Sequence, residues 1–377
     1  MITTYTIRIP DERLAAIASK IAAYDWSRVP DAGGWSSGIG IADLKRLVNY
    51  WRDSYDWRKV ERRLNQLPNF VADVDGERIH FVHAKGDGSK PPLLLLHGWP
   101  GSFLEFERLL GPLVADGHDV VVPSLPGFAF SQPITGVIGP RRVGELMFEL
   151  MSRLFGSSRF VLQGGDWGAH IASWMAYARP EALLGFHINM VAIYARDAEP
   201  ATPEEVSFFS RRKAILDLET GYNHQQETRP QTLGVALADS PIGTAAWIME
   251  KFGAWADLPK RVDGSPDIWS GFSEDQLLTN IMLYVGPTSE VTSTWIYRGN
   301  RLEEASRFPA GTRIRAPMGV AAFPDPVFIP TPRSFVEKTY NVVHWTDMPR
   351  GGHFAAMEQP ELMLADLRAF VTRVSRP

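Results

Sequence analysis

One stretch, residues 159–179, constrains the fold more than any other part of the chain. Residues 159–162 are mostly apolar and predict a buried strand, and residues 169–179 have the composition of a helix. Between them lies the turn Gly164-Gly165-Asp166-Trp167-Gly168. A strand, a glycine-lined turn and a helix in this order are the context of a nucleophile elbow, because glycines permit the strained backbone that lifts one side chain clear of the turn. The lifted side chain here is Asp166.

Asp166 stands where such a turn usually carries serine, so the pattern reads G-x-D-x-G. An aspartate ionises at pH ~4 and is a nucleophile at neutral pH without help from a base. A carboxylate suits attack on a carbon that bears a leaving group better than it suits amide hydrolysis. The alternative is a helix N-cap, a position that aspartate favours. The turn alone supports both interpretations.

The bulk composition bounds the size and the partners of the chain. Its 377 residues, 45% of them hydrophobic, are enough for one large α/β domain with an insertion or for two domains. The net charge of −4, without a long block of like charge, gives no electrostatic footprint for nucleic acid. The chain has no cysteine, which excludes a disulfide framework and a cysteine nucleophile. This absence favours a cytoplasmic location but is compatible with any redox compartment.

Several kinds of segment and motif are missing from the sequence. Residues 1–10 lack the apolar core of a signal peptide, and no window of ~18 residues is apolar throughout, so we expect no membrane anchor. The chain also lacks H-E-x-x-H, ligands at zinc spacing, a Walker A sequence and a G-x-G-x-x-G after a strand. Zinc-dependent hydrolysis and nucleotide binding are therefore poorly supported.

The order of the predicted elements divides the chain into three parts. Residues 1–75 hold three short amphipathic helices, at 12–24 with Asp11 as its cap, at 41–53 and at 57–67, and are expected to wrap a larger domain. Residues 76–194 alternate strands and helices, which predicts a mostly parallel sheet covered on both faces. Residues 195–308 are helical in pattern and predict a cap over the carboxyl edge of the sheet. Strand patterns return in residues 309–377, before a closing helix at 360–372.

Motifs spread over the whole chain resemble those of one known family. The elbow, the turn HGWP at 97–100 and the late sequence GGHF at 351–354 together resemble the α/β-hydrolase fold. The N-terminal region, the cap sequences GYNHQQ at 221–226 and ADSPIG at 238–243, and RGGHFAAME at 350–358 resemble the epoxide hydrolases of the microsomal type. The motifs combined are far more specific than G-x-D-x-G alone. The resemblance implies an α/β-hydrolase core with a helical cap and an N-terminal meander.

The resemblance also implies roles for particular residues. Asp166 matches the nucleophile, which attacks one epoxide carbon and forms an alkyl-enzyme ester, and His353 matches the base that activates water to hydrolyse this ester. The backbone amides of Trp99 and Trp167 are expected to form the oxyanion hole. His97 is expected to be structural, and the Trp99–Pro100 bond is a candidate cis peptide.

Two tyrosines match the pair that this branch uses to donate hydrogen bonds to the epoxide oxygen: Tyr222 in GYNHQQ and Tyr297 in TWIYRGN. A phenol, with a pKa of ~10, is protonated at neutral pH and more acidic than the alcohol that forms. The alternative for each is a buried tyrosine with a satisfied hydroxyl, with Tyr284 and Tyr194 as substitutes. Four aromatic residues of the cap are candidates for apolar pocket walls or for plain core: Trp247, Phe252, Trp255 and Trp295.

The acid partner of His353 is the least defined member of the site. Asp325 is the only acid in the loop at 322–327, and it stands one place before the family position of the acid, which Pro326 occupies here. In some related hydrolases the acid follows the strand after the elbow helix, which indicates Asp197 or Glu199. We favour Asp325, and these two alternatives remain open.

The implied reaction converts an epoxide and water to a vicinal diol and needs no cofactor or metal. The aromatic content favours an apolar epoxide of moderate size. Detoxification is the expected context of such a reaction, and a homodimer is a further expectation. Two alternatives share parts of this site. A haloalkane dehalogenase has the same nucleophile but binds its leaving halide with N–H donors, and a catalytically silent ligand-binding protein has the same fold.

Overall fold

A single mixed sheet forms the centre of the molecule in the computed structural model, which describes residues 1–375. Within this range nine strands lie in the order β1-β2-β3-β5-β4-β6-β7-β8-β9. The pairs that join β1, β2, β3 and β5 are antiparallel, and the pairs from β5 to β9 are parallel. The predicted α/β class is confirmed. The strands are β1 (Ile2–Thr4), β2 (Asn69–Val74), β3 (Glu77–Ala84), β4 (Leu93–Leu96), β5 (Val120–Pro123), β6 (Phe160–Gly164), β7 (Leu183–Ile188), β8 (Ile314–Ala322) and β9 (Tyr340–Asp347).

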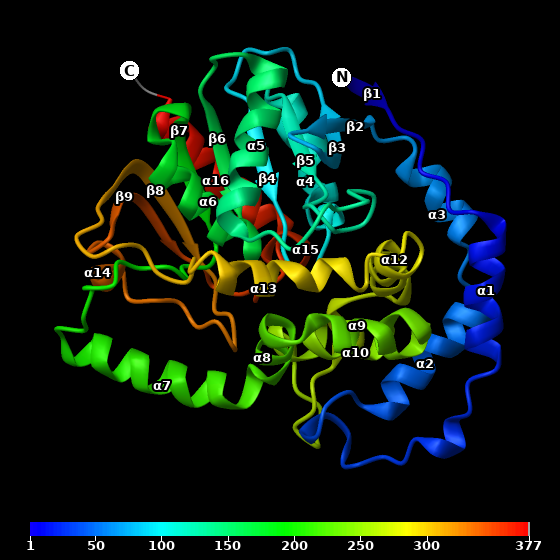
Figure 1. Ribbon diagram of the computed structural model, residues 1–377. Helices are drawn as coiled ribbons and strands as arrows, with labels where there is room; N and C mark the ends of the chain where they lie inside the picture. Colours follow the sequence, from blue (N-terminus) through cyan, green and yellow to red (C-terminus); the bar gives the residue numbers. More distant parts are fainter. Residues whose placement is uncertain (376–377) are drawn as a thin grey trace.

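Helices cover both faces of the parallel strands. Helices α5 and α6 pack against each other, as do α4 and α16, and Figure 1 shows α5 and α6 in front of the strands and α16 behind them. All four residues of β4 are buried, as expected for a strand with helices on both sides. The core helices are α4 (Glu107–Ala115), α5 (Pro140–Phe155), α6 (Trp167–Ala178), α14 (Arg333–Val336), α15 (Ala355–Glu358) and α16 (Pro360–Val374), with short 3₁₀ turns η3 (Phe103–Phe106) and η4 (Pro180–Ala182).

A group of helices between β7 and β8 lies over the carboxyl ends of β4 and β5. Asn280 donates a hydrogen bond to the carbonyl of Pro100 at 2.7 Å, and Thr292 donates one to the carbonyl of Gly127 at 2.6 Å. Pro100 and Gly127 lie in the loops that follow these two strands. The group consists of α7 (Pro203–Glu219), α8 (Gly221–Thr228), α9 (Pro230–Asp239), α10 (Pro241–Trp255), α11 (Ile268–Gly271), α12 (Glu274–Val285), η5 (Thr292–Thr294) and α13 (Trp295–Leu302).

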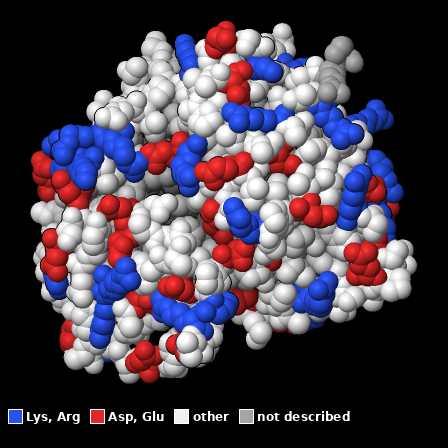
Figure 2. All heavy atoms as spheres, turned by 180° about the vertical axis from the view of Figure 1, so that it is seen from behind, with Lys and Arg blue, Asp and Glu red and all other residues white. Residues whose placement is uncertain are grey.

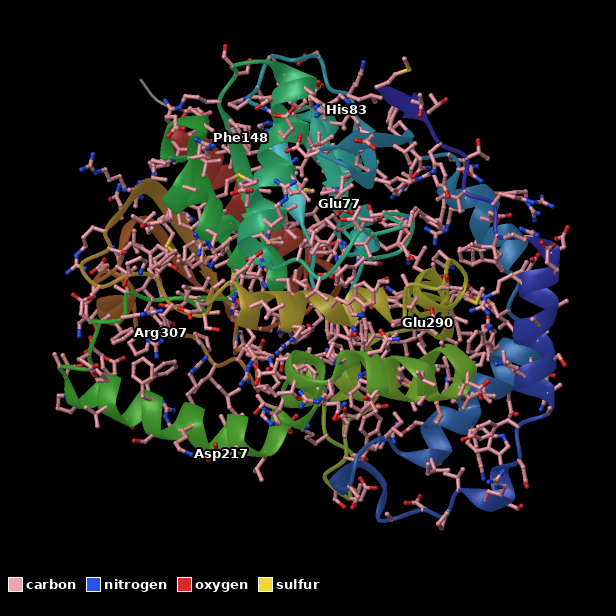
Figure 3. All side chains as sticks on the ribbon, in the orientation of Figure 1. Glu77, His83, Phe148, Asp217, Glu290 and Arg307 are labelled. Atoms are coloured by element: carbon pink, nitrogen blue, oxygen red, sulfur yellow. The ribbon has the colours of Figure 1, made fainter. Side chains whose placement is uncertain are left out.

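The N-terminal segment runs along the outside of these cap helices (Figure 1). Helix α1 packs on α10, and α2 packs on α10 and α12. The Arg13 side chain donates to the carbonyl of Val285 at 2.6 Å and lies 3.6 Å from the carboxylate of Glu290, which Figure 3 labels beside α12. The segment therefore contacts the cap as well as the core. Its elements after β1 are α1 (Asp11–Ala22), η1 (Trp26–Arg28), η2 (Gly34–Ser36), α2 (Ile41–Asp53) and α3 (Trp57–Leu64).

Some predicted boundaries are wrong, and the reasons are physical. Asp11 is the first residue of its helix and not the cap, since Pro10 precedes it and the Asp11 carboxylate binds Arg58 and Arg8 instead. The strand predicted at 159–162 extends to Gly164, and the helix predicted from 169 begins at Trp167. The turn that carries Asp166 is therefore tighter than expected.

Three short elements had no signal in the periodicity. Strand β1 is three residues long and gains its hydrogen bonds from β2, where Ile2 faces Ala72. Helices α8 and α13 have eight residues each and pack against each other. Two turns are too short for a helical period to stand out in the sequence. Tyr222 lies on α8 and Tyr297 lies on α13, so these two helices position the predicted phenols.

The surface carries mixed charge. Figure 2 shows lysine and arginine interspersed with aspartate and glutamate over the face opposite that of Figure 1, and no region of one sign covers that face. This distribution agrees with the small net charge of −4. Within residues 1–375, no helix is long and apolar enough to cross a membrane.

Candidate active site

Asp166 lies in the tight turn between β6 and α6. Its φ angle of 46° is in the left-handed region, which strains any residue with a side chain. Two backbone segments approach closely on either side of Asp166, and a Cβ on Gly164 would lie 2.3 Å from the carbonyl oxygen of Gly168. This close packing holds the strained backbone of Asp166 in place. The carboxylate does not cap α6. Asp166 does hold the N-cap position, as the alternative interpretation had it, but its carboxylate accepts a hydrogen bond from the Trp99 amide at 2.8 Å instead.

The loop after β4 places the Trp99 amide at this carboxylate. A Cβ on Gly98 would lie 2.0 Å from an oxygen of Asp166, so glycine is required for the close approach. The Trp99–Pro100 bond is cis, as predicted. Trp167 begins α6, and the first amides of a helix have no partner inside it. His97 is buried and accepts a hydrogen bond from the Leu125 amide at 3.1 Å, which is a structural contact.

His353 and Asp325 form a buried pair beside Asp166. Asp325 follows β8 and His353 follows β9, so neighbouring parallel strands deliver both side chains to the same edge of the sheet. Nδ1 of His353 lies 2.9 Å from Oδ2 of Asp325, and Nε2 lies 3.4 Å from Oδ2 of Asp166. The other oxygen of Asp325 accepts two amides at 2.8 Å, those of Val327 and Phe328. These amides fix the direction of the carboxylate.

The two other candidate acids lie away from His353. Asp197 is exposed and accepts the amide of Gly311 at 3.0 Å, and Glu199 is exposed as well. Asp325 is therefore the one of the three acids that the structure brings to the histidine. The missing family residue at Pro326 is compensated by the loop, whose backbone turns Asp325 inward.

The negative charges around His353 determine its protonation. Burial disfavours the imidazolium, but the carboxylates of Asp166 and Asp325 favour it more strongly and raise the pKa of His353 to about 10. Nε2 of His353 has no hydrogen-bond partner among the described residues, because its contact with Asp166 is long and misaligned.

The predicted tyrosines lie together against Trp99 and Trp167, the two tryptophans next to Asp166. The ring centres of Tyr222 and Tyr297 are 5.9 Å apart. Trp99 stacks on Tyr222 with ring centres 5.3 Å apart, and Trp167 contacts Tyr297 edge to face at 4.7 Å. Among the described residues, the buried Tyr297 hydroxyl has no hydrogen-bond partner. Burial and the charge of Asp166 raise the pKa of Tyr222 well above its usual range. The pKa of Tyr297 is raised in the same way, so both phenols are protonated at neutral pH and can donate hydrogen bonds.

The substitute tyrosines are used elsewhere. The Tyr284 hydroxyl donates to the carbonyl of Gly101 at 2.5 Å, and the Tyr194 hydroxyl donates to the carbonyl of Val191 at 2.8 Å. Tyr284 and Asn280, both on α12, hold the turn that carries the Trp99 amide. Sequence reasoning missed this function of α12.

The four candidate wall residues differ in position. Trp255 contacts Tyr222 at 5.1 Å and His353 at 4.9 Å between ring centres. Phe252 stacks on Phe354 at 4.0 Å, in the core behind the histidine. Trp247 is half-buried and donates to Gln226 at 2.9 Å, and Trp295 is half-buried on α13. Among the described residues, Trp255 is the one of the four whose ring contacts Tyr222 and His353.

Two charged residues near the site were not predicted. The Glu105 carboxylate lies against Gly101, where a Cβ would meet it at 1.8 Å, and burial raises the pKa of Glu105 to about 8. Lys251 is buried on α10 and lies over the ring of Tyr222. The sequence contains a signal for Lys251, because a lysine is unusual on a largely apolar helix. Within residues 1–375, no cluster of three or more histidine and acidic side chains is arranged to hold a metal ion.

The order of the site along the chain is that of one class of protein. An aspartate on a strand-turn-helix elbow is followed by a second aspartate after β8 and a histidine after β9, which is the chain order of nucleophile, acid and histidine in this class. A family model described as "alpha/beta hydrolase fold" matches residues 91–209. The fold and the site together define an α/β hydrolase.

Comparison with known proteins narrows this class. A model described as "Epoxide hydrolase N terminus" matches residues 2–106. A putative epoxide hydrolase of Stigmatella aurantiaca is 39% identical over 97% of this chain and 84% of its own length, and epoxide hydrolase 1 of Sus scrofa is 33% identical over 98% and 88%. The solved structure of the Aspergillus niger epoxide hydrolase has a TM-score of 0.85 and 30% identity, covering 99% of this chain and 97% of that one. The chain belongs to the epoxide hydrolase family.

Proposed function

We propose that the protein hydrolyses an epoxide to a vicinal diol through an ester on Asp166. One observation carries the proposal: the Asp166 carboxylate shares a site with a buried phenol, Tyr297, which contacts the rings of Trp99 and Trp167 and whose hydroxyl has no partner among the described residues. A nucleophile and an acid in one site suit a substrate whose carbon is attacked while its oxygen is protonated. An epoxide is such a substrate.

In the first half-reaction, an oxygen of Asp166 attacks one epoxide carbon. The carbon–oxygen bond of the ring breaks, and the leaving oxygen takes a proton from Tyr222 with a hydrogen bond from Tyr297. The negative charge thus moves from Asp166 to the phenol. Burial in an apolar site strengthens these hydrogen bonds, because water does not compete for the donors.

In the second half-reaction, His353 takes a proton from water, and the hydroxide adds to the carbonyl carbon of the ester. The amides of Trp99 and Trp167 stabilise the oxyanion, a contribution of ~10²–10³ in rate per donor. Collapse of the intermediate releases the second alcohol, which takes the proton from His353. The new carboxyl group of Asp166 gives its proton to the phenolate, which restores the enzyme. The net reaction converts the epoxide and one water to the diol.

We also propose a division of these tasks among three parts of the chain. Residues 76–194 and 309–377 supply the nucleophile, the base and the acid, and residues 195–308 supply the phenols and apolar walls. Residues 1–75 cover the cap and the core from outside. We further propose that the substrate is apolar, which a panel of epoxides tests, and that the protein forms a homodimer, which sedimentation tests. A cytoplasmic location is tested by cell fractionation, and a role in detoxification by a deletion strain.

The origin of the oxygen atoms tests the proposal. In a single turnover in ¹⁸O-labelled water with excess enzyme and a styrene-type oxide, the diol contains no label and the peptide with Asp166 gains one labelled oxygen. Mass spectrometry of both products gives the answer. Label in the diol would mean direct attack by water and would overturn the role of Asp166. Release of halide from a bromoalkane, with no diol from any epoxide, would identify the dehalogenase instead.

A further inference from the structure

Lys251 has an unusual environment for a lysine. It lies on α10 and is 7% exposed, whereas lysine side chains are rarely buried without a partner. Its Nζ lies over the ring of Tyr222, 4.8 Å from the centre, and 5.8 Å from the centre of the Trp255 ring. Its counter-ion is the neighbouring Glu250 at 2.5 Å. The ammonium therefore contacts one of the phenols directly.

The charge on Tyr222 changes during the proposed reaction. The neutral phenol attracts a cation on its face through the quadrupole of the ring. When the phenol gives up its proton, negative charge spreads from the oxygen into the ring, and the attraction becomes stronger. Burial and the carboxylate of Asp166 oppose the phenolate at this position. A cation on the ring offsets that opposition.

We propose that Lys251 is a positioning residue for epoxide opening, because its ammonium fixes the Tyr222 ring and stabilises the negative charge that the ring acquires. The inference rests on the proposed function. As the ester bond to Asp166 forms and the ring bond of the epoxide breaks, a proton passes from the Tyr222 hydroxyl to the epoxide oxygen. The negative charge leaves the side of His353 and arrives beside Lys251.

Other charged groups near this pair come from α10, from the end of α7 and from two loops. Glu250 on α10 and Glu219 at the end of α7 are negative, Lys260 lies close to Glu219, and Asp166 lies on the far side of the phenols. Glu250 reduces the effect of the ammonium but does not reverse it, since the positive end of the ion pair is the end that lies over the ring. Removing Glu250 therefore leaves the function of Lys251 intact.

Pre-steady-state kinetics tests the inference. Rapid mixing with a styrene-type oxide, followed by the fluorescence of Trp99 and Trp255, measures ester formation. Lys251→Met is expected to slow this step roughly 10- to 30-fold, the size of a partly desolvated cation–π contact, and Lys251→Arg is expected to restore most of the loss. Glu250→Gln is expected to lose little. Lys338→Met is the matched control, because Lys338 also lies over a ring, Phe335 at 5.0 Å, and pairs with a buried glutamate, but outside the site.

A second set of variants separates electrostatics from packing. In a Tyr222→Phe background, Lys251→Met is expected to add no further loss, because no charge develops on the ring. A fluorinated tyrosine at 222, whose phenol is more acidic, is expected to recover much of the rate in Lys251→Met. Equal losses in Lys251→Met and Glu250→Gln, or a full loss in the Tyr222→Phe background, would overturn the inference.

The proposed function is checked by the same assay. If the wild-type protein forms no ester on Asp166, the proposed function fails and the role of Lys251 fails with it. If the wild-type forms the ester and Lys251→Met forms it equally fast, the role of Lys251 alone fails. Circular dichroism of each variant reports folding, and if Lys251→Met does not fold, Lys251→Gln takes its place in every comparison.

Discussion

At the scale of single residues, the charge of Asp166 controls the protonation of His353. Oδ2 of Asp166 lies 3.4 Å from Nε2 of His353, and with Asp325 on the other side the pKa of His353 is raised to about 10. A protonated histidine does not accept a proton from water. In the proposed mechanism, ester formation removes the charge of Asp166 and lowers the pKa of His353, whose proton passes to solvent and returns from solvent when the carboxylate is restored. His353 is therefore a base only when there is an ester to hydrolyse. Electrostatics thus sets the order of the two half-reactions.

Replacing Asp166 by asparagine imitates this loss of charge. We expect Asp166→Asn to lower the pKa of His353 from about 10 toward the ordinary range near ~7, because one of the two carboxylates that favour the imidazolium is gone and burial still opposes it. An NMR titration of the His353 ring measures the pKa. Asp325→Asn is the companion variant and should lower it as well. An unchanged pKa in Asp166→Asn would contradict the coupling.

Removing the phenols tests the other side of the site. Tyr222→Phe and Tyr297→Phe are each expected to slow ester formation by ~10²-fold or more, within the range for a positioned acid, while hydrolysis of the preformed ester changes little. Single-turnover kinetics with a styrene-type oxide separates the two steps. Tyr194→Phe is the control, since its hydroxyl donates to the carbonyl of Val191 and not to the substrate. Undiminished diol formation in both phenol variants would refute the assignment.

At the scale of elements, one buried carboxylate joins two strands and a helix. Asp366 on α16 accepts hydrogen bonds from His187 on β7 and His344 on β9, both at 2.8 Å, and from Thr346 at 2.5 Å. His187 is fully buried. Burial opposes the charge of Asp366, but these donors outweigh it and lower its pKa to about 2. Asp325 follows β8 and His353 follows β9, so this contact helps to hold in place the strands from which both loops begin.

Removing this carboxylate is expected to destabilise the fold. Asp366→Asn should cost about 2–4 kcal/mol of unfolding free energy at pH 7, because two histidines lose a charged partner. In the wild-type, the contribution is present above pH ~4 and is lost as the pH falls toward about 2, since the folded pKa lies below the unfolded one. Urea unfolding between pH 7 and pH 2 measures both. Asp119→Asn, at a partly exposed His–Asp contact of 3.4 Å, should cost less.

The elements also show where sequence reasoning succeeds. The elbow and the strands around it were predictable because glycine spacing and apolar runs are local properties that the backbone obeys directly. Asp325 was not decidable from the sequence, since the amides of Val327 and Phe328 turn it toward His353. The sequence does not show that Lys251 contacts the ring of Tyr222, because this contact depends on how α8 packs in the folded protein. Short elements and long-range pairs depend on tertiary contacts, which no local pattern contains.

At the scale of the whole molecule, one acidic residue ties the N-terminal segment to the cap. Asp43 on α2 accepts hydrogen bonds from the indole of Trp35 at 2.7 Å, from the indole of Trp269 at 2.6 Å and from Arg261 at 2.8 and 2.9 Å. The bonds hold the ring of Trp35 against α10, where it lies on Gly253. Gly253 stands between Lys251 and Trp255, both of which reach the active site. The N-terminal segment thus supports the helix that lines the site.

Filling the space under Trp35 is expected to weaken this support. An added Cβ in Gly253→Ala would lie 2.4 Å from the ring of Trp35, so the ring has to move away and the bonds to Asp43 are strained. We expect Gly253→Ala to lower the melting temperature, although alanine favours a helix by about 1 kcal/mol over glycine. Hydrogen exchange should increase in the loop around Trp35. Gly111→Ala is the matched control on α4, where the Cβ meets nothing within 4 Å, and it should raise stability. A gain of stability in both variants would show that Trp35 does not need its place on Gly253.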